Sequence, residues 1–196
     1  MIDSDDSLLQ RMSRGEGIAF DYLFLRYYAP VYRVAYRLVG SREKAEDLTQ
    51  ETFLELYRNA PVLDRDPTLL PWLCRVVLNK GYNTLRGEKR EQERVERWSV
   101  TPEQLDPVVE VLRSEEQAKV REVLGALPER HSELLMLRHA GLTYGEIASV
   151  IGVAPGSVGT LLVRAERAFL AAYKGQEKVE QTETESMKGT RPWQNA

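Results

Sequence analysis

Cysteine and histidine are scarce in this chain of 196 residues, which contains one cysteine, Cys74, and two histidines. A single cysteine cannot form an internal disulfide, and so few thiol and imidazole groups argue against a structural zinc site. We expect Cys74 to be a buried small hydrophobic residue, with a redox role as the alternative. The sequence also contains no nucleophile–base constellation and no glycine-rich phosphate loop. We therefore expect no enzymatic activity, no metal and no cofactor.

Long apolar runs are also missing. No stretch approaches the ~18 consecutive apolar residues that a membrane span needs. The N-terminus, MIDSDDSLLQ, lacks the basic and then apolar segments of a signal peptide. We expect a cytoplasmic protein that does not insert into a membrane.

Positive charge is in slight deficit, because 27 lysines and arginines stand against 30 aspartates and glutamates. The deficit is unevenly distributed along the chain. Seven basic and four acidic residues lie between Trp72 and Trp98, whereas six acidic and three basic residues lie between Ser99 and Leu127. The formal net charge of -3 thus conceals a basic segment that is followed by an acidic connector.

Strand signals are absent, and apolar residues recur at helical spacing along most of the chain. This pattern predicts an all-α fold of two small helical domains, at residues 7–98 and 108–174, joined by a short linker at residues 99–107. The tail at residues 175–196 is polar, and it has too few apolar groups to offset the entropy of ordering. We expect this tail to be disordered.

Glycine, serine and proline mark the expected ends of the helices. Gly15 and Gly17 should interrupt the first helical segment, and Pro30 should interrupt it again. Gly40 can end that segment, and Ser41 can cap the next one. Further helices are expected at Arg42 to Asn59, Pro71 to Lys89 or Trp98, Val108 to Ala126, Pro128 to His139 and within Leu142 to Tyr173, with a proline-rich loop before Pro71.

The segment LTYGEIASVIGVAPGSVGTLLVRAERAF, from Leu142 to Phe169, meets the local requirements of a helix-turn-helix. Ala148 is small enough for the two helices to cross, Gly152 tolerates the turn, and Val158 anchors the second helix. The outward face of that helix has one arginine, Arg164, and otherwise small groups. Because phosphate neutralisation supplies most non-specific affinity, we expect this segment alone to bind DNA weakly. The alternative is a pair of packed helices without DNA binding.

Three segments together resemble the extracytoplasmic-function group of bacterial sigma factors. They are AEDLTQETFLELYR from Ala45 to Arg58, PWLCRVVLNKGYNTLRGEKR from Pro71 to Arg90, and LPERHSELLMLRHAGLTYGEIASVIGVAPGSVGTLLVRAERAF from Leu127 to Phe169. The resemblance extends from about Leu8 to Tyr173. It implies sigma region 2 at residues 7–98 and sigma region 4 at residues 108–174. The partners that it implies are core RNA polymerase, through the β′ clamp helices and the β flap, promoter DNA, and an anti-sigma factor.

In that family the first segment docks on the β′ clamp helices. The residues that the resemblance implies for this surface combine acidic and amide groups with apolar anchors, a composition typical of protein interfaces. They are Asp47, Gln50, Glu51, Phe53, Leu54 and Tyr57. The alternative is an ordinary solvated helix face.

The second segment resembles the element that binds the minus-ten promoter strand. Asparagine can present both a donor and an acceptor to an unstacked base, and nearby cations can bind phosphates. The residues implied are Arg75, Asn79, Lys80, Asn83 and Arg86, with Leu63, Leu69 and Leu70 as the pocket for a flipped base. We expect Trp72 to belong to the core.

The third segment resembles the reader of the minus-thirty-five element. The residues implied are Arg138, Pro155, Ser157, Gly159, Thr160 and Arg164. Family members often have a cation where Gly159 and Leu161 stand, and a serine cap where Ala154 stands. These departures put the number of base contacts in doubt and favour reading of DNA shape.

One main hypothesis and two alternatives follow. The main one is an alternative sigma factor that binds core polymerase, recognises both promoter elements and nucleates DNA melting. The alternatives are a stand-alone helix-turn-helix transcriptional regulator and a helical adaptor that binds a protein partner. The acidic net charge fits the main hypothesis, because polymerase would supply most phosphate contacts and the linker would set the effective concentration of two tethered modules.

Overall fold

The computed structural model describes residues 3–59, 69–96 and 111–189, and within them it contains eight α-helices and no strand. The helices are α1 (Asp5–Ser13), α2 (Gly17–Val39), α3 (Arg42–Arg58), α4 (Leu70–Glu96), α5 (Val111–Ala126), α6 (Glu129–His139), α7 (Tyr144–Ile151) and α8 (Pro155–Gly189). The all-α fold class predicted from the sequence is confirmed.

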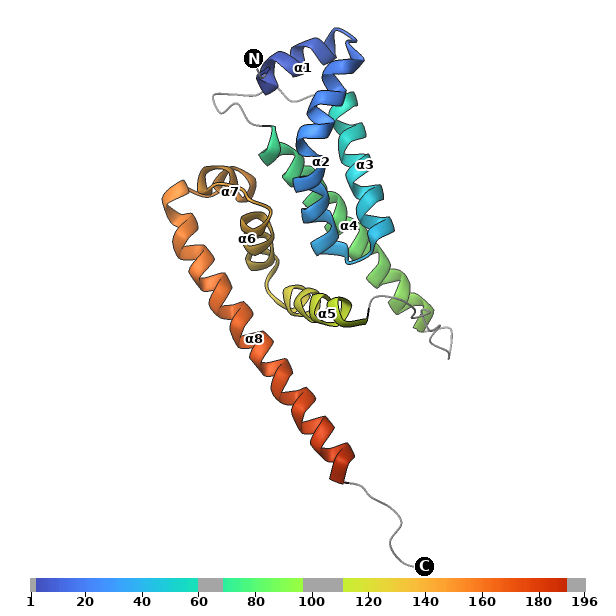
Figure 1. Cartoon of the computed structure of the whole chain (residues 1–196), viewed down its shortest axis with the longest axis vertical. Helices are drawn as coiled ribbons and strands as arrows, with labels where there is room; N and C mark the ends of the chain where they lie inside the picture. Colours follow the sequence, from blue (N-terminus) through green and yellow to red (C-terminus); the bar gives the residue numbers. More distant parts are fainter. Residues whose placement is uncertain (1–2, 60–68, 97–110, 190–196) are drawn as a thin grey trace, which may run out of the picture.

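The helices form two groups (Figure 1). In the first group, α2, α3 and α4 pack along one another and α1 packs against α2. In the second group, α5, α6 and α7 pack against the N-terminal part of α8, which then continues away from the body. Large side chains fill both interiors, including Leu23, Phe53, Leu56 and Leu73 in the first group and Leu134, Leu137, Ile147 and Val158 in the second.

The connection between α2 and α3 has the predicted helix signals. Gly40 adopts a φ of 72°, and its N–H donates to the carbonyl of Tyr36. The Ser41 hydroxyl accepts a hydrogen bond from the N–H of Lys44 at 3.4 Å. Glycine adopts this left-handed conformation without a steric penalty, and serine satisfies an orphan N–H of the first turn. Local chemistry therefore determines where these two helices meet.

Pro30 does not interrupt α2, so that prediction is wrong. Proline removes one backbone donor from the helix, which costs stability. The next turn, however, places Val31, Val34 and Ala35 in the core, where each is fully buried. Burial of these side chains offsets the missing hydrogen bond.

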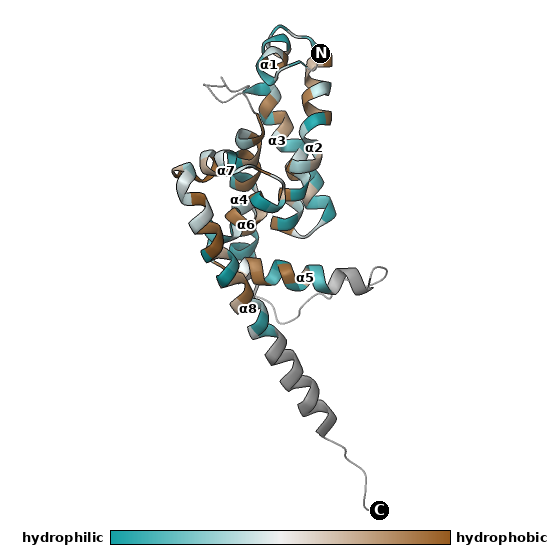
Figure 2. Ribbon diagram, turned by 60° about the vertical axis from the view of Figure 1, so that its left-hand side comes forward, coloured by the Kyte–Doolittle hydropathy of each residue, from teal (hydrophilic) through white to brown (hydrophobic). Residues whose placement is uncertain are grey.

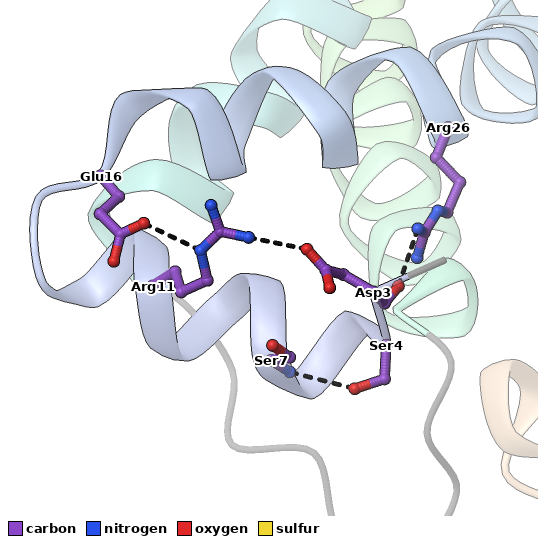
Figure 3. A network of polar contacts seen from close by, with 6 residues as sticks. All are labelled: Asp3, Ser4, Ser7, Arg11, Glu16 and Arg26. Carbon is purple, nitrogen blue, oxygen red and sulfur yellow. Dashed lines mark hydrogen bonds and ion pairs between the residues drawn. The ribbon is translucent and has the colours of Figure 1, made fainter. Parts of the chain in front are cut away.

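Polar contacts fix α1 against α2 (Figure 3). The Arg11 guanidinium lies between two carboxylates, at 2.7 Å from Asp3 and 2.8 Å from Glu16. Arg26 of α2 donates to the carbonyl of Asp3 at 2.9 Å. Arg11 and both carboxylates are largely accessible to water, so we expect their ion pairs to orient α1 more than to stabilise it.

A buried carboxylate, Asp5, connects three segments. It accepts hydrogen bonds from the guanidinium of Arg26 at 2.5 Å, from the hydroxyl of Tyr27, and from the N–H of Leu69 at 2.8 Å. Burial, followed by the bond to Asp5, raises the pKa of Tyr27 well above its usual value. Because Leu69 directly precedes α4, this network positions the N-terminus of that helix.

The second group contains the predicted helix-turn-helix, formed by α7 and the start of α8. The hydroxyl of Thr143 accepts from the N–H of Glu146, and the Glu146 carboxylate accepts from the N–H of Thr143 at 2.8 Å. This capping box satisfies donors at the first turn of α7. Gly152 ends α7 with a φ of 74°, and Val158 of α8 is fully buried.

α8 continues to Gly189, so the prediction of disorder is wrong for residues 175–189. Residues 190–196 lie outside the described part of the chain. Adding residues to an existing helix needs no new nucleus, and the added segment is rich in glutamate, glutamine and lysine. The intrinsic helix propensity of residues 175–189 therefore extends α8 beyond the part that packs against the other helices.

Apolar and hydrophilic residues alternate along the helices in Figure 2. Across the described residues, no individual helix is both long enough and apolar enough to span a bilayer. Only α7 and residues 155–176 of α8, bent by 86°, reach that threshold when they are counted together.

Candidate functional site

The polar edge of α3 is exposed as predicted, with one exception. Leu54 and Tyr57 are large apolar side chains that are 49% and 61% exposed. Around them lie the exposed polar side chains Asp47, Gln50 and Glu51. Exposed apolar anchors beside acidic and amide groups are typical of a protein interface.

Phe53 is the exception, and its assignment to the docking surface is wrong. Its side chain is 2% exposed, and its ring lies 4.8 Å from that of Phe24, centre to centre. It therefore belongs to the core. Tyr57, one turn later, packs edge-on against Phe20 at 5.6 Å while keeping most of its surface accessible. Phe20, which itself packs against Phe53, thus supports the exposed ring of Tyr57.

α4 presents the predicted minus-ten residues along its length. Arg75, Asn79, Asn83 and Arg86 are exposed, and Lys80 is half-buried. The Lys80 ammonium lies 3.3 Å from the carboxylate of Glu51 on α3. The Asn79 and Asn83 amides are one helical turn apart, which places them on the same face of α4. This face can present two amides to bases, with cations nearby for phosphates.

The predicted pocket for a flipped base is only partly described. Leu69 is fully buried, so its assignment to a DNA-contacting pocket is wrong. Its N–H is bound by Asp5, which directs the side chain into the core. Leu70 is half-buried, and Leu63 lies outside the described residues. Trp72 is half-buried and packs against the core, as predicted.

Cys74 is fully buried in α4. Burial raises the pKa of its thiol to about 12, with a smaller contribution from the charge of Glu146. A thiol with this pKa is protonated at neutral pH and therefore a poor nucleophile. These features favour the packing role over the redox alternative.

The start of α8 presents few groups to a nucleic acid. Pro155, Ser157, Thr160 and Arg164 are exposed, as predicted. Gly159 is half-buried, and a Cβ built on it would lie 3.5 Å from the Tyr144 ring. Tyr144 therefore partly covers the position at which family members often have a cation. The resulting face is small and weakly charged.

Arg138 lies at the end of α6, where it is exposed. Its guanidinium carbon is 5.4 Å from the centre of the Tyr144 ring. A second contact runs from Arg138 to the carbonyl of Leu142 at 3.5 Å. Stacking on an aromatic ring restricts the orientation of the guanidinium. Arg138 is thus held beside the helix-turn-helix.

The two helix groups touch along a seam that the sequence did not predict. Arg86 of α4 donates to both carboxylate oxygens of Glu129 on α6, at 3.0 and 3.2 Å. Arg75 of α4 donates to the carbonyl of Ser149 on α7. Arg33 of α2 donates to the carbonyl of Ala140 at 3.3 Å. Helical periodicity cannot reveal such pairs, because it describes each helix separately.

The seam thus engages two of the predicted minus-ten arginines with the other half of the molecule. A carboxylate on Arg86 and a carbonyl on Arg75 occupy some of the N–H donors of these two guanidinium groups. Tyr82 lies beside Arg86, whose guanidinium carbon is 5.9 Å from the ring centre, and burial followed by the charges of Glu133 and Glu129 raises the pKa of Tyr82. In this arrangement the second half of the chain covers part of the α4 surface.

A groove of about 780 Å³ lies in the second group, between α5, α6 and α8. Its lining is largely apolar and includes Val120, Leu124, Leu135, Met136, Phe169 and Leu170. Arg37 of α2 forms part of one wall. The groove is large enough to accept apolar side chains of a protein partner.

Comparison with known families gives two matches. Residues 23–91 match Sigma-70 region 2, and residues 117–169 match Sigma-70, region 4. Among curated proteins, the chain is 30% identical to the RNA polymerase sigma-H factor of Pseudomonas aeruginosa over 178 residues, which cover 85% of this chain and 92% of that protein. It is 30% identical to the ECF RNA polymerase sigma-E factor of Haemophilus influenzae over 173 residues, or 83% and 91% of the two chains.

Solved structures share the fold. CnrH in complex with the cytosolic domain of CnrY matches with a TM-score of 0.67 at 23% identity, over 88% of this chain and 99% of that one. The sigma factor RpoE in complex with the anti-sigma factor NepR from Bartonella quintana matches with a TM-score of 0.56 at 22% identity, over 79% and 96%. At these identities the likeness concerns the fold alone.

Proposed function

The chain belongs to the extracytoplasmic-function group of the sigma-70 family, and from that premise we propose which of its surfaces bind RNA polymerase and which bind promoter DNA. As an alternative sigma factor, it binds core RNA polymerase and recognises the minus-ten and minus-thirty-five promoter elements. It also nucleates DNA melting for transcription initiation. A stand-alone regulator is not supported. We place the polymerase and minus-ten functions in residues 7–98 and the minus-thirty-five function in residues 108–174.

The α3 edge is the proposed docking surface for the β′ clamp helices. Exposed Leu54 and Tyr57 would be its apolar anchors, with Asp47, Gln50 and Glu51 around them. Binding energy at interfaces concentrates in a few such anchors, while the surrounding polar groups give orientation. Phe53 acts from the core by supporting this edge.

The exposed face of α4 is the proposed minus-ten surface. Asn79 and Asn83 would contact unstacked bases of the melted strand, and Arg75, Lys80 and Arg86 would bind its phosphates. Extruding a base from the duplex costs a few kcal/mol, so these contacts must form together with melting.

The start of α8, with Arg138 beside it, is the proposed minus-thirty-five surface. Ser157, Thr160 and Arg164 offer few contacts, which favours recognition of DNA shape. We assign the apolar groove between α5, α6 and α8, which Arg138 also lines, to the β flap, because it can bury apolar side chains of a protein.

The proposed mechanism depends on one observation: Arg75 and Arg86 form hydrogen bonds with the second half of the chain at the seam. In the free chain these donors bind the second half. Docking on polymerase would pull the halves apart, free both arginines for the promoter strand, and place the two DNA surfaces at a fixed separation. The contacts of Arg75 and Arg86 are exposed, so each of them is weak enough for a large interface to break.

The chain would contribute recognition and melting but no catalysis, since nucleotide transfer belongs to the polymerase. We place it in the cytoplasm because its proposed partners are core RNA polymerase and promoter DNA. A sigma factor with this fold has been solved with an anti-sigma factor, which supports an anti-sigma factor as a partner of this chain. Such a partner would cover the polymerase-docking or DNA-binding surfaces.

Transcription from a random promoter library tests the proposal. Core polymerase with the full chain should select two elements at one spacing, and core polymerase alone should select none. The absence of promoter-directed transcripts would contradict a sigma function. Selection of the same duplex by the chain without polymerase would favour the stand-alone regulator instead.

A further inference from the structure

A cleft of about 410 Å³ lies at the seam. Its walls come from both halves of the chain. α2 contributes Tyr32, Arg33, Tyr36 and Arg37, and the second half contributes Glu116, Gln117, Val120, Arg121, Leu124 and His139. The cleft has its present shape only when the two halves are together.

Positive charge in this cleft is not neutralised. Arg33, Arg37 and Arg121 form no ion pair with any carboxylate in the described part of the chain, whereas Arg11, Arg26, Arg42 and Arg86 each do. One carboxylate, that of Glu116, lines the cleft with them. Three arginines and one glutamate along the same cleft create a net positive potential.

The titration of neighbouring groups is consistent with this potential. The pKa of His139 lies below its usual value, chiefly because of the charge of Arg37, then burial, then Arg33. Burial, followed by Arg33, also lowers the pKa of Arg37. An anion in the cleft would relieve both effects.

The tyrosine rings of α2 at the cleft stack on one another, and Arg121 stacks on one of them. Tyr32 stacks on Tyr28 at 5.9 Å and on Tyr36 at 6.0 Å, centre to centre. Arg121 of α5 lies over the ring of Tyr36, with its guanidinium carbon 5.7 Å from the ring centre. Arg121 thus reaches across the seam to α2, and it lines the same cleft as Arg33 and Arg37.

We propose that this cleft binds a small ligand with adjacent phosphate groups, such as pyrophosphate or the phosphate chain of a nucleotide, and that the bound ligand holds the two halves together. Guanidinium groups match phosphate oxygens in pairs, so three of them can bind more than one phosphate. The inference rests on the proposed function, in which the two halves of the polymerase-free chain are in contact at the seam, and it adds a ligand to that arrangement.

A small anion fits this place better than an acidic protein segment. The halves touch directly at two contacts: Arg33, which lines the cleft, donates to the carbonyl of Ala140, and Arg86 pairs with Glu129 elsewhere along the seam. An inserted helix would have to separate these contacts. A ligand of a few atoms in width would fill the space and bridge α2 to α5.

Titration calorimetry of the full chain tests the site, with inorganic pyrophosphate and ATP as probes and Arg33→Gln, Arg121→Gln and Arg42→Gln as variants. Pyrophosphate should bind the unaltered chain, and each cleft variant should weaken binding about tenfold or more, because each loses a charge-assisted contact. Arg42→Gln removes an equal charge outside the cleft and should not change the affinity. Tighter binding of ATP than of pyrophosphate would mean that the base also contributes.

Two results would overturn the proposal. One is the absence of pyrophosphate binding by the folded chain at millimolar concentration. The other is equal loss of affinity in all three variants, which would indicate attraction by net charge alone.

Energy transfer between dyes on Glu43→Cys and Lys174→Cys measures whether the halves are held together. Cys74 is buried and should remain unlabelled. Pyrophosphate should stabilise the high-transfer state and slow its loss when core polymerase is added, and this effect should vanish in Arg121→Gln. No change in transfer would overturn the bridging role. Promoter-directed transcription without ligand is a separate readout, so its failure would count against the proposed function and not against this site.

Discussion

The two halves of the chain are equipped very differently for DNA. α4 in the first half carries two exposed amides and the exposed cations Arg75, Arg86, Lys89 and Arg90, whereas the start of α8 in the second half carries one arginine among small groups. The first half can therefore bind a single strand through phosphates and bases. The second half is better suited to reading the shape of a duplex that another protein holds.

The halves also differ in whether these groups already have hydrogen-bond partners in the other half of the chain. Arg75 and Arg86 are bound by a carbonyl and a carboxylate of the other half, while Ser157, Thr160 and Arg164 have open surroundings. The half with more charge is the one that the closed arrangement covers. On the proposed function, this difference would keep the acidic chain from binding DNA before it reaches polymerase.

The largest expected effects separate docking from packing on α3. Leu54→Ala and Tyr57→Ala should each weaken binding to core polymerase about 30-fold, as loss of an interface anchor does, with little loss of stability. Phe53→Ala should instead lower the free energy of unfolding by about 3–5 kcal/mol. Chemical denaturation and a core-binding assay distinguish the two. A stable Phe53→Ala variant with a pure docking defect would place Phe53 on the interface after all.

A smaller effect should separate the two DNA surfaces. Asn79→Ala or Asn83→Ala should slow open-complex formation on a selected promoter by about 10- to 100-fold, because a base contact is worth about 1–3 kcal/mol. Ser157→Ala and Thr160→Ala should cost only a few-fold, since their contacts are fewer. Equal losses in both sets would mean that the second half reads bases as directly as the first.

The turn of the helix-turn-helix gives a third contrast. Gly152 has a φ of 74°, so Gly152→Ala should cost about 1–2 kcal/mol of stability. Gly125 lies within α5, with nothing within 4 Å of a Cβ built on it, so Gly125→Ala should stabilise by up to about 1 kcal/mol. Thermal unfolding of both variants should therefore give shifts of opposite sign.

The seam should give the smallest effect. Glu129→Gln removes an exposed partner of Arg86, and such pairs are worth about 0–1 kcal/mol. Single-stranded DNA should then bind the polymerase-free chain a few-fold more tightly, as measured by fluorescence anisotropy. Glu122→Gln makes the same charge change on α5 and serves as the control. If both variants behave alike, the Glu129 contact does not restrict DNA binding.

Features that depend on a few neighbouring residues could be predicted from the sequence. Gly40 and Ser41 end and begin helices through their own backbone and side-chain chemistry, and Gly152 and Val158 specify the helix-turn-helix in the same way. Those rules act within one turn, so no partner segment has to be known.

Features that depend on distant segments could not be predicted. Phe53 directly precedes the exposed Leu54, and packing against Phe24 of α2 makes it a core residue, while Leu69 is buried where its N–H bonds to Asp5 of α1. The contacts of Arg86 with Glu129 and of Arg33 with Ala140 join residues far apart in the chain. Pro30 lies within an uninterrupted helix for the same reason, since burial of the next turn outweighs the local cost of proline.

Affinity for a selected promoter duplex, measured for the chain alone and for its complex with core polymerase at one salt concentration, tests the central claim most directly. We predict that the free chain binds at the level of non-specific association, roughly 10⁻⁴–10⁻⁶ M, and that only the complex distinguishes the selected duplex from a scrambled one. Tight, sequence-specific binding by the chain alone, without association with core polymerase, would contradict it.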